Sequence, residues 1–580
     1  MYKSFSLSNN KAMINFSSYY CDSYEKVLDS EGFCKVLSSY LSKSKNANTK
    51  TYRFISDKLG TDDLTIINKE VISLFKLLSI MNLDEIIKIN EKYNTFSNYK
   101  DELIDFVEDL YRYWRKIERY TLIFNNKITE GLEKTRFIEA NQDFSNLILS
   151  LYRKVEENIL QITPNVYRQL PAGGNAGLVL SNNDWKIPPL YEPLKNIPFI
   201  ENILLDPPFI VYPKKNKREG TFKEVFENPI KDCKVTTRHW FCFPAKVGDL
   251  LAYIYFHRDF MSHGISLCNL FEIAKKEEYQ GKKPDIVYVF GARCNSNETK
   301  NVFYNDIEND IMLGLVSYSD EIDYFGYMKK MTLTLHNLIM LKRGYLPLHG
   351  AMANITLKNG KQANVILIGD SGAGKSETLE AIRNLKANFV SELSIIFDDM
   401  GTIRLKNDDI LAYGTEIGAF VRLDDLDQGY AFKEIDRSIF MNPDKTNARL
   451  IIPVSSYKEI IKGQKVDLFL YANNYDKVED GNSIELFTDV EKAIDVFKSG
   501  KRLAKGTTNE VGLVSSYFAN PFGPLQWQDR SDELIEIYFK TLFDKGIKVG
   551  QIKTQLGIKG LEKEGPTLAA KALFELINNL

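Results

Sequence analysis

Apolar residues recur every three or four positions through the first part of the chain. In DELIDFVEDLYRYWRKIERY this spacing is kept by Leu103, Phe106, Leu110, Trp114, Ile117 and Tyr120. The same period returns in FSNLILSLYRKVEENILQI, which begins at Phe144. Such spacing places the apolar side chains on one face of a helix. It predicts a mostly α-helical N-terminal domain over residues 1–165, with these faces forming the core of a bundle rather than a partner-binding groove.

The helical period ends in QLPAGGNAGLVLSNNDWKIPPLYEP, which is rich in Gly, Pro and Asn. It predicts a linker over residues 166–195. Short β-like runs follow, namely PFIVY, HWFCF, LLAYIYF, DIVYVFGA, ANVILIG, LSIIFDD, ARLIIPV and VDLFLYA. Helical stretches alternate with these runs, which is typical of an α/β or mixed α+β region. We divide this region into one subdomain over 196–345 and a second over 346–580.

Composition and net charge limit the partners and the cellular compartment that we expect. The chain has 580 residues, with 44% hydrophobic and 26% charged residues and a formal net charge of −2. This charge gives no reason to expect nucleic acid or an anionic membrane as a partner. No apolar run approaches the roughly 20 residues that cross a bilayer, and the N-terminus lacks the pattern of a signal peptide. The six cysteines form neither a C-x-x-C pair nor a zinc-type cluster. We therefore expect a reduced, cytoplasmic setting.

A phosphate-binding loop is predicted between the run ANVILIG and a following helix. The pattern G-x-x-x-x-G-K-[ST] is satisfied by Gly369, Asp370, Ser371, Gly372, Ala373, Gly374, Lys375 and Ser376. Its glycines let the backbone turn tightly and direct N–H groups at phosphate oxygens, and the helix adds its positive end. We expect Lys375 to contact the transferred phosphoryl group and Ser376 to hold a divalent ion.

Two further segments carry candidate metal ligands. SIIFDDMGTI predicts an apolar strand that ends at Asp398 and Asp399, and carboxylates beside a phosphate loop are natural ligands of Mg²⁺ or Mn²⁺. YLPLHGAMANI places His349 about 20 residues before the loop. The other four histidines, His239, His257, His263 and His336, are interpreted as structural.

Taken together, these segments resemble the phosphoenolpyruvate carboxykinase family. The similarity runs in order through KPDIVYVFGARCNSN, YFGYMKKMTLTLHNLIMLKRGYLPLHGAMAN, DKTNARLIIPV, KVDLFLYANNYDKV and LAKGTTNEVGLVSSYFANPFGPLQ. It covers roughly residues 200 to 580. The resemblance implies a P-loop catalytic region of the carboxykinase type, preceded here by the helical domain.

The resemblance also implies roles for matching residues. Manganese would be held by Lys330, His349 and Asp399, with Lys330 binding as the neutral amine. Lys329 would place a second positive charge near the phosphoryl group, and Tyr324 would line the substrate pocket. Arg449 would bridge donor and acceptor phosphates, a bidentate task suited to a guanidinium.

The central segments LHGAMANI, IGDSGAGKSET and FDDMGTI also resemble HPr kinase/phosphorylase, which shares this nucleotide-binding core. The chain departs from ATP-dependent carboxykinases at the arginine stretch that grips the organic acid. Arg218 in YPKKNKREGTFKEV and Arg293 in GARC are the candidate replacements. The stretch near the adenine is altered to LGIKGLEKEG, so ATP is the expected donor with GTP or pyrophosphate as alternatives.

We therefore expect a cytoplasmic, Mn²⁺- or Mg²⁺-dependent enzyme that converts oxaloacetate and a phosphoryl donor to phosphoenolpyruvate and CO₂. A first alternative keeps the kinase chemistry but transfers the phosphoryl group to a protein or small-molecule hydroxyl. A second is a nucleotide-gated binding module, with the helical domain as its output. The retained lysine, histidine and aspartate set favours an enzyme, because a binding module has less need for a complete metal site.

Overall fold

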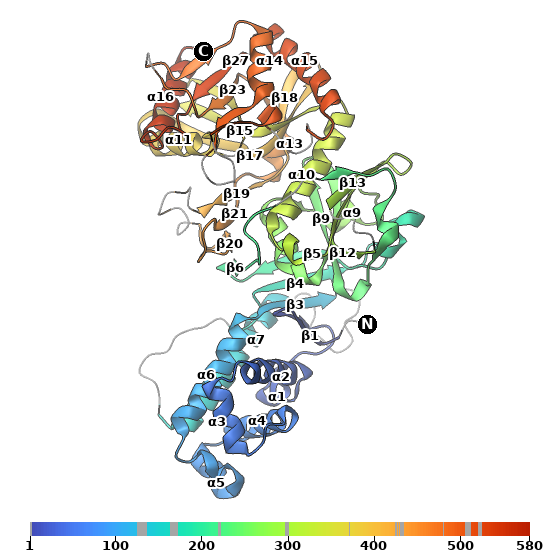
Figure 1. Cartoon of the computed structure of the whole chain (residues 1–580), viewed down its shortest axis with the longest axis vertical. Coiled ribbons are helices and arrows are strands. Elements are labelled where there is room, and N and C mark those ends of the chain that lie inside the picture. Colours follow the sequence, from blue (N-terminus) through green and yellow to red (C-terminus); the bar gives the residue numbers. More distant parts are fainter. Residues whose placement is uncertain are drawn as a thin grey trace. The chain divides into compact units, whose positions relative to one another are not determined.

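The computed structural model describes residues 3–124, 136–162, 172–218, 222–295, 301–370, 372–423, 426, 429, 434–478, 481–504, 512–519 and 525–580. The chain forms two compact units (Figure 1). The first is Met1–Asn182 with Pro198–Asp206, and the second is Asn183–Ile197 with Pro207–Leu580. Both units contain helices and strands, so the chain is a mixed α/β protein, as the sequence predicts.

The first unit combines a helical bundle with a five-stranded sheet. Its helices are α1 (Tyr24–Asp29), α2 (Glu31–Asn46), α3 (Lys50–Leu59), α4 (Leu64–Leu78), α5 (Leu83–Ile89), α6 (Lys100–Lys116) and α7 (Phe137–Leu160). Its strands, in spatial order, are β1 (Phe5–Ser8), β2 (Lys11–Asn15), β3 (Glu118–Phe124), β4 (Ala176–Ser181) and β5 (Phe199–Leu205). Strands β2, β3 and β4 run parallel, and β1 and β5 are antiparallel to their neighbours.

This sheet corrects the predicted organisation of the N-terminal region. The predicted helical stripe is real in α6, where Leu103, Phe106 and Leu110 are buried, but the helix ends at Lys116 and Tyr120 lies in β3. The predicted linker over 166–195 contains β4, which is buried along its whole length. The strands β2, β3 and β4 were missed because each is short and is paired in parallel with a strand far away in the sequence, which local periodicity does not record.

The second unit begins with a sheet ordered β9-β10-β12-β14-β13-β7. These strands are β9 (Trp240–Val247), β10 (Leu250–His257), β12 (Ile286–Cys294), β14 (Ile311–Ser317), β13 (Asn301–Asp306) and β7 (Lys223–Glu224), with β8 (Cys233–Lys234) and β11 (Glu272–Ile273) pairing at the side. Strands β10, β12 and β14 are parallel. Three helices accompany them, α8 (Met261–Ser266), α9 (Lys276–Tyr279) and α10 (Phe325–Lys342). Helix α10 is buried over nearly its whole length, so its first turn is held firmly in place.

An eight-stranded sheet carries the phosphate loop. Its order is β22 (Gln464–Lys465), β18 (Asp409–Gly414), β17 (Val390–Lys406), β15 (Leu346–Leu357), β16 (Gln362–Ile368), β23 (Leu468–Asn473), β27 (Lys548–Lys553) and β24 (Ile484–Leu486). Its helices are α11 (Lys375–Phe389), α13 (Tyr457–Ile461), α14 (Val490–Ser499), α15 (Gln528–Asp544) and α16 (Glu564–Asn578). All eight β-like runs predicted from residue 196 onward are strands in the structure.

Alternating residues of β16 enter two different cores. Val365 and Leu367 pack with side chains of α11 and α16. Ile366 and Ile368 pack with side chains of α14 and α15. Both faces of this sheet are therefore covered by helices (Figure 1). A strand buried on both faces explains why ANVILIG is apolar throughout rather than alternating.

Two small sheets complete the second unit. One is ordered β19 (Gly418–Arg422), β21 (Arg449–Pro453), β20 (Ile439–Met441) and β6 (Phe209–Val211). The other pairs β25 (Lys501–Leu503) with β26 (Leu513–Ser515).

The structure also pairs Cys233 with Cys294 in a disulfide, which the expected reduced setting did not anticipate. The two residues are 61 positions apart in sequence and meet only because β8 pairs with β12. Within the described ranges, no helix has the length and apolar character needed to cross a membrane.

Candidate functional site

The phosphate loop joins β16 to α11, as predicted. Gly372 and Gly374 have φ angles of 80° and 98°, a region that residues with a side chain rarely adopt. A Cβ at Gly374 would also lie 2.5 Å from Oγ1 of Thr554. Both glycines are therefore favoured by the backbone conformation, and Gly374 is also required by the nearby Thr554. Ser371, also predicted to bind phosphate, lies outside the described residues.

The side chain of Lys375 lies against its own loop. Its Nζ donates to the carbonyl oxygen of Gly369 and, at 3.2 Å, to that of Asp370. Two side chains from elsewhere brace the same loop. Asn474 Nδ2 donates to Gly372 O at 2.9 Å, and Thr554 Oγ1 donates to Ala373 O at 2.7 Å. Lys375 is thus buried at the start of α11, and the N-terminus of a helix is where phosphate loops bind the phosphate.

The two predicted carboxylates, Asp398 and Asp399, lie inside β17 rather than at its end. Strand β17 continues to Lys406 because it pairs with β15 on one side and β18 on the other. Asp399 has a φ angle of 120°, which is strained for a residue with a side chain. The pairing of Asp399 with Gly350 in β15 brings this carboxylate beside His349.

Asp399 is the centre of a charged cluster. Its Oδ1 lies 2.9 Å from Nε2 of His349, and its Oδ2 lies 2.5 Å from Nζ of Lys329. Nδ1 of His349 is hydrogen-bonded to the carbonyl oxygen of Ala519. That bond requires a proton on Nδ1, while Nε2 faces the carboxylate. This orientation is the one in which a histidine binds a metal ion through Nε2.

Burial alone would raise the pKa of Asp399. The charge of Lys329 and the hydrogen bond with His349 outweigh it and hold that pKa well below its usual range. The neighbouring carboxylate behaves in the opposite way, because burial and the charge of Asp399 together raise the pKa of Asp398. Ser376 Oγ lies 3.4 Å from Oδ1 of Asp398, so two of the predicted metal ligands are in contact.

The consecutive lysines of α10, Lys329 and Lys330, also have pKa values shifted in opposite directions. Burial opposes the charge of Lys329, but the carboxylates around it more than compensate and raise its pKa. Burial and the nearby charge of Arg218 lower the pKa of Lys330 to about 8, although Asp399 and Asp370 oppose this shift. Lys329 is therefore a fixed cation, whereas Lys330 can become the neutral amine that metal binding requires.

Glu416 was not predicted, yet it belongs to the cluster. It is only 1% exposed, and its Oε1 lies 3.4 Å from Nζ of Lys329. Burial and the charges of Asp399 and Asp398 raise its pKa to about 8 despite the lysine. The residue follows β18 and precedes β19, and no local pattern marks it in the sequence.

A second unpredicted residue is Arg502 in β25. Its Nε donates to Oδ2 of Asp370 at 3.0 Å, and the pair is largely buried. Nδ1 of His349 lies 3.8 Å from the other oxygen of Asp370. Asp370 therefore links the phosphate loop to β25, whose last residue, Leu503, begins the segment LAKGTTNEVGLVSSYFANPFGPLQ. Residues 505–511 and 520–524 of that segment lie outside the described residues.

Tyr324, Arg449 and Arg218 lie beside the same cluster. Tyr324 precedes α10 and is 7% exposed; burial raises the pKa of its hydroxyl, and the positive charge of Arg449 opposes that shift. Arg449 is directly opposite Arg422 in the β19–β21 pairing, so both side chains project from one face. Arg218 is close enough for its charge to act on Tyr324 and Lys330. Opposed arginines repel one another, and an anion between them would relieve that repulsion.

Arg293, the rival substrate arginine, lies elsewhere in the unit. Its guanidinium lies 4.7 Å from the ring of Tyr318, and its charge acts on His257 and His239. The hydroxyl of Tyr318 donates to Asp259 at 2.7 Å. Of the two candidates, the structure brings Arg218 to the cluster and leaves Arg293 in a separate network.

Three residues have the donor chemistry that could hold a divalent ion of the manganese type. They are a lysine with a lowered pKa, a histidine oriented through Nδ1, and a carboxylate, namely Lys330, His349 and Asp399. Across the described ranges, no group of three or more His, Cys, Asp and Glu side chains is placed to hold a metal. A site here therefore depends on the lysine as its third ligand.

No protein-family model matches this chain, and no curated protein matches it in sequence.

Proposed function

We propose that the second unit is a metal-dependent phosphoryl transferase of the carboxykinase type. The observation that carries this proposal is the convergence at one loop of Lys375, the pair Asp398 and Asp399, and the Lys329–Asp399–His349 contacts. Phosphoryl transfer needs positive charge around the donor, carboxylates for its metal ions and a positioned acceptor. Lys375 and Lys329 would supply the positive charge, and Asp398 and Asp399 would supply the carboxylates.

A divalent ion would be held by Lys330, His349 and Asp399, and a donor-bound ion by Ser376 and Asp398. Such ions act as Lewis acids that offset the charge developing on phosphoryl oxygens. Lys375 would turn from its loop carbonyls to the phosphates, since it is already anchored at the start of α11. Lys329 would keep its charge throughout, because two carboxylates stabilise it.

The acceptor side favours an organic acid. Arg449, Arg218 and the hydroxyl of Tyr324 form a cationic group beside the lysines. For oxaloacetate, the bond between the methylene carbon and its carboxylate would break, CO₂ would leave, and the electron pair would form an enolate. The enolate oxygen would attack the γ-phosphorus as the bond to the β-phosphate oxygen breaks. Arg449 and Lys329 would stabilise the enolate and the transferring group electrostatically.

A hydroxyl kinase is the second candidate, and Glu416 favours it. A buried carboxyl group whose pKa is raised to about 8 is mostly protonated at neutral pH and becomes a general base for an acceptor hydroxyl at mildly alkaline pH. The decarboxylating reaction has no such need, since its enolate forms without proton removal. ATP is the donor we propose, with GTP or pyrophosphate as alternatives.

The test is a screen of the purified chain with Mn²⁺ or Mg²⁺ present. It crosses ATP, GTP and pyrophosphate with oxaloacetate, with phosphoenolpyruvate plus bicarbonate, and with simple alcohols. Phosphorus NMR identifies each product. Phosphoenolpyruvate formed from oxaloacetate supports the carboxykinase reaction. A phosphate ester formed from an alcohol, without turnover of oxaloacetate, supports the hydroxyl kinase.

A further inference from the structure

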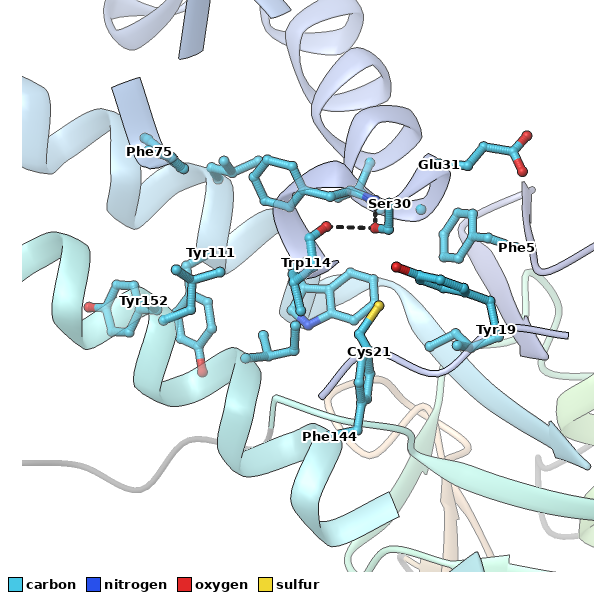
Figure 2. Close-up of a pocket in the computed structure, with 18 of the residues that line it drawn as sticks. Phe5, Tyr19, Cys21, Ser30, Glu31, Phe75, Tyr111, Trp114, Phe144 and Tyr152 are labelled. Atoms are coloured by element: carbon cyan, nitrogen blue, oxygen red, sulfur yellow. Dashed lines mark hydrogen bonds between the residues drawn. The ribbon is translucent and has the colours of Figure 1, made fainter. Parts of the chain in front are cut away.

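The first unit contains a pocket of about 140 Å³ between its sheet and its helices. Figure 2 shows Phe5, Tyr19 and Glu31 at one end and Tyr111 and Tyr152 at the other, with Trp114 between them. Strands β1 and β2 and helices α1, α2, α4, α6 and α7 contribute to its wall. Protein interiors are packed closely enough that voids of this size are uncommon.

The wall of the pocket offers almost no hydrogen-bonding group, because its polar atoms are engaged elsewhere. Nε1 of Trp114 donates to the carbonyl oxygen of Ala172 at 2.7 Å. The hydroxyl of Tyr152 donates to Glu108. The hydroxyl of Ser30 caps α2, accepting from Phe33 N at 3.0 Å. A ligand that fills this space is therefore expected to be largely apolar.

The charged residue at the rim is also engaged, since Glu31 forms an ion pair with Lys35 at 2.5 Å. The side chain of Tyr19 is 41% exposed, so this end of the pocket is close to solvent. Gly32 shapes the same end, because a Cβ there would lie 3.0 Å from the ring of Phe5. The pocket thus has an uncharged interior with an approach from solvent at one end.

We propose that this pocket binds a small uncharged ligand built on an aromatic ring. An apolar cavity of roughly 150 Å³ accommodates benzene, so the volume suits one ring or a fused pair. The wall is rich in rings, including Phe5, Phe75, Trp114 and Phe144, and aromatic rings pack favourably edge to face. An unfilled cavity lowers stability, and a single larger side chain would close it. The proposal concerns the first unit alone and is independent of the phosphoryl-transfer chemistry.

The test uses the full chain and isothermal calorimetry with indole as the probe. Ile148→Phe fills the pocket from α7, and Ile138→Phe makes the same change on the same helix at a site that is 68% exposed. We expect indole to bind the wild type and Ile138→Phe equally, and Ile148→Phe at least about ten times more weakly. Val36→Leu adds one methylene to the wall and carries the test if Ile148→Phe does not fold.

Three results would overturn the proposal. The first is no heat of indole binding to the wild type up to its solubility. The second is unchanged affinity in both filled variants. The third is binding of octanoate in place of indole, which would mean that the pocket takes an alkyl chain rather than a ring.

Discussion

Replacing Asp399 with asparagine should destabilise the second unit, whereas the same change at Asp398 should not. Asparagine keeps the shape of the side chain and removes only the charge. Asp399 would lose its ion pair with Lys329 at 2.5 Å and its contact with His349 at 2.9 Å. Asp398 would lose a charge that burial and its neighbour already disfavour.

The magnitude follows from the burial of these groups. Removing one partner of a buried ion pair costs about 3–5 kcal/mol, because the other charge is left in the interior. Two features reduce this cost here. The side chain of Asp399 is 32% exposed, and Lys329 keeps Glu416 at 3.4 Å. We therefore expect Asp399→Asn to lower the free energy of unfolding by about 2–3 kcal/mol. Asp398→Asn should change it by less than about 1 kcal/mol.

The assay is urea denaturation of the metal-free proteins at pH 7, so that metal binding does not add to the stability of either variant. Tryptophan fluorescence reports mainly on the second unit, which holds Trp185, Trp240 and Trp527 of the chain's four tryptophans. The two variants serve as controls for each other. Equal losses in both variants, or no loss in Asp399→Asn, would refute the assignment of opposite roles to the two carboxylates.

Three further predictions follow from single contacts. His336 is buried with its pKa lowered to about 4, so between pH 6.5 and 4 the unfolded chain takes up a proton that the folded chain does not. The wild type should therefore lose on the order of 2–3 kcal/mol more of its free energy of unfolding than His336→Gln when the pH falls from 6.5 to 4, as urea denaturation at the two pH values would show. Arg218→Ala should reduce kcat/KM for oxaloacetate about 30-fold or more, while Arg293→Ala leaves it within about twofold, as steady-state kinetics would show. Gly374→Ala should abolish nucleotide binding in calorimetry, because its Cβ would strike Thr554.

The sequence predicted the second unit well because its elements have strong local patterns. Strands buried on both faces, such as β16 and β23, are continuous apolar runs, and the glycines of the phosphate loop satisfy a backbone requirement that spacing alone reveals. The strands of the first unit were missed for the opposite reason. β2 and β4 are short, and each is stabilised by pairing with β3 from a distant part of the chain.

The candidate site was predicted only where a motif marks it. Lys375, Asp399 and His349 belong to recognisable segments, and the structure brings Asp399 and His349 into contact. Glu416 and Arg502 were missed because each joins the cluster only through its tertiary neighbours. Strand β17 was predicted to end at Asp398 and Asp399, where its apolar run ends. It continues because neighbouring strands on both sides satisfy its backbone.

The central claim is that the phosphate loop and its carboxylates transfer a phosphoryl group. The most direct measurement compares the wild type with Lys375→Ala for Mn²⁺-dependent phosphoryl transfer from ATP to oxaloacetate under identical conditions. Lys375 is the point charge at the phosphates, so the variant should lose on the order of 10³-fold or more in rate while its circular dichroism is unchanged. A wild type that turns over with Mn²⁺ and a folded Lys375→Ala that does not would support the account. A folded variant with near-normal activity, or a wild type inactive with every donor and acceptor in the screen, would contradict it.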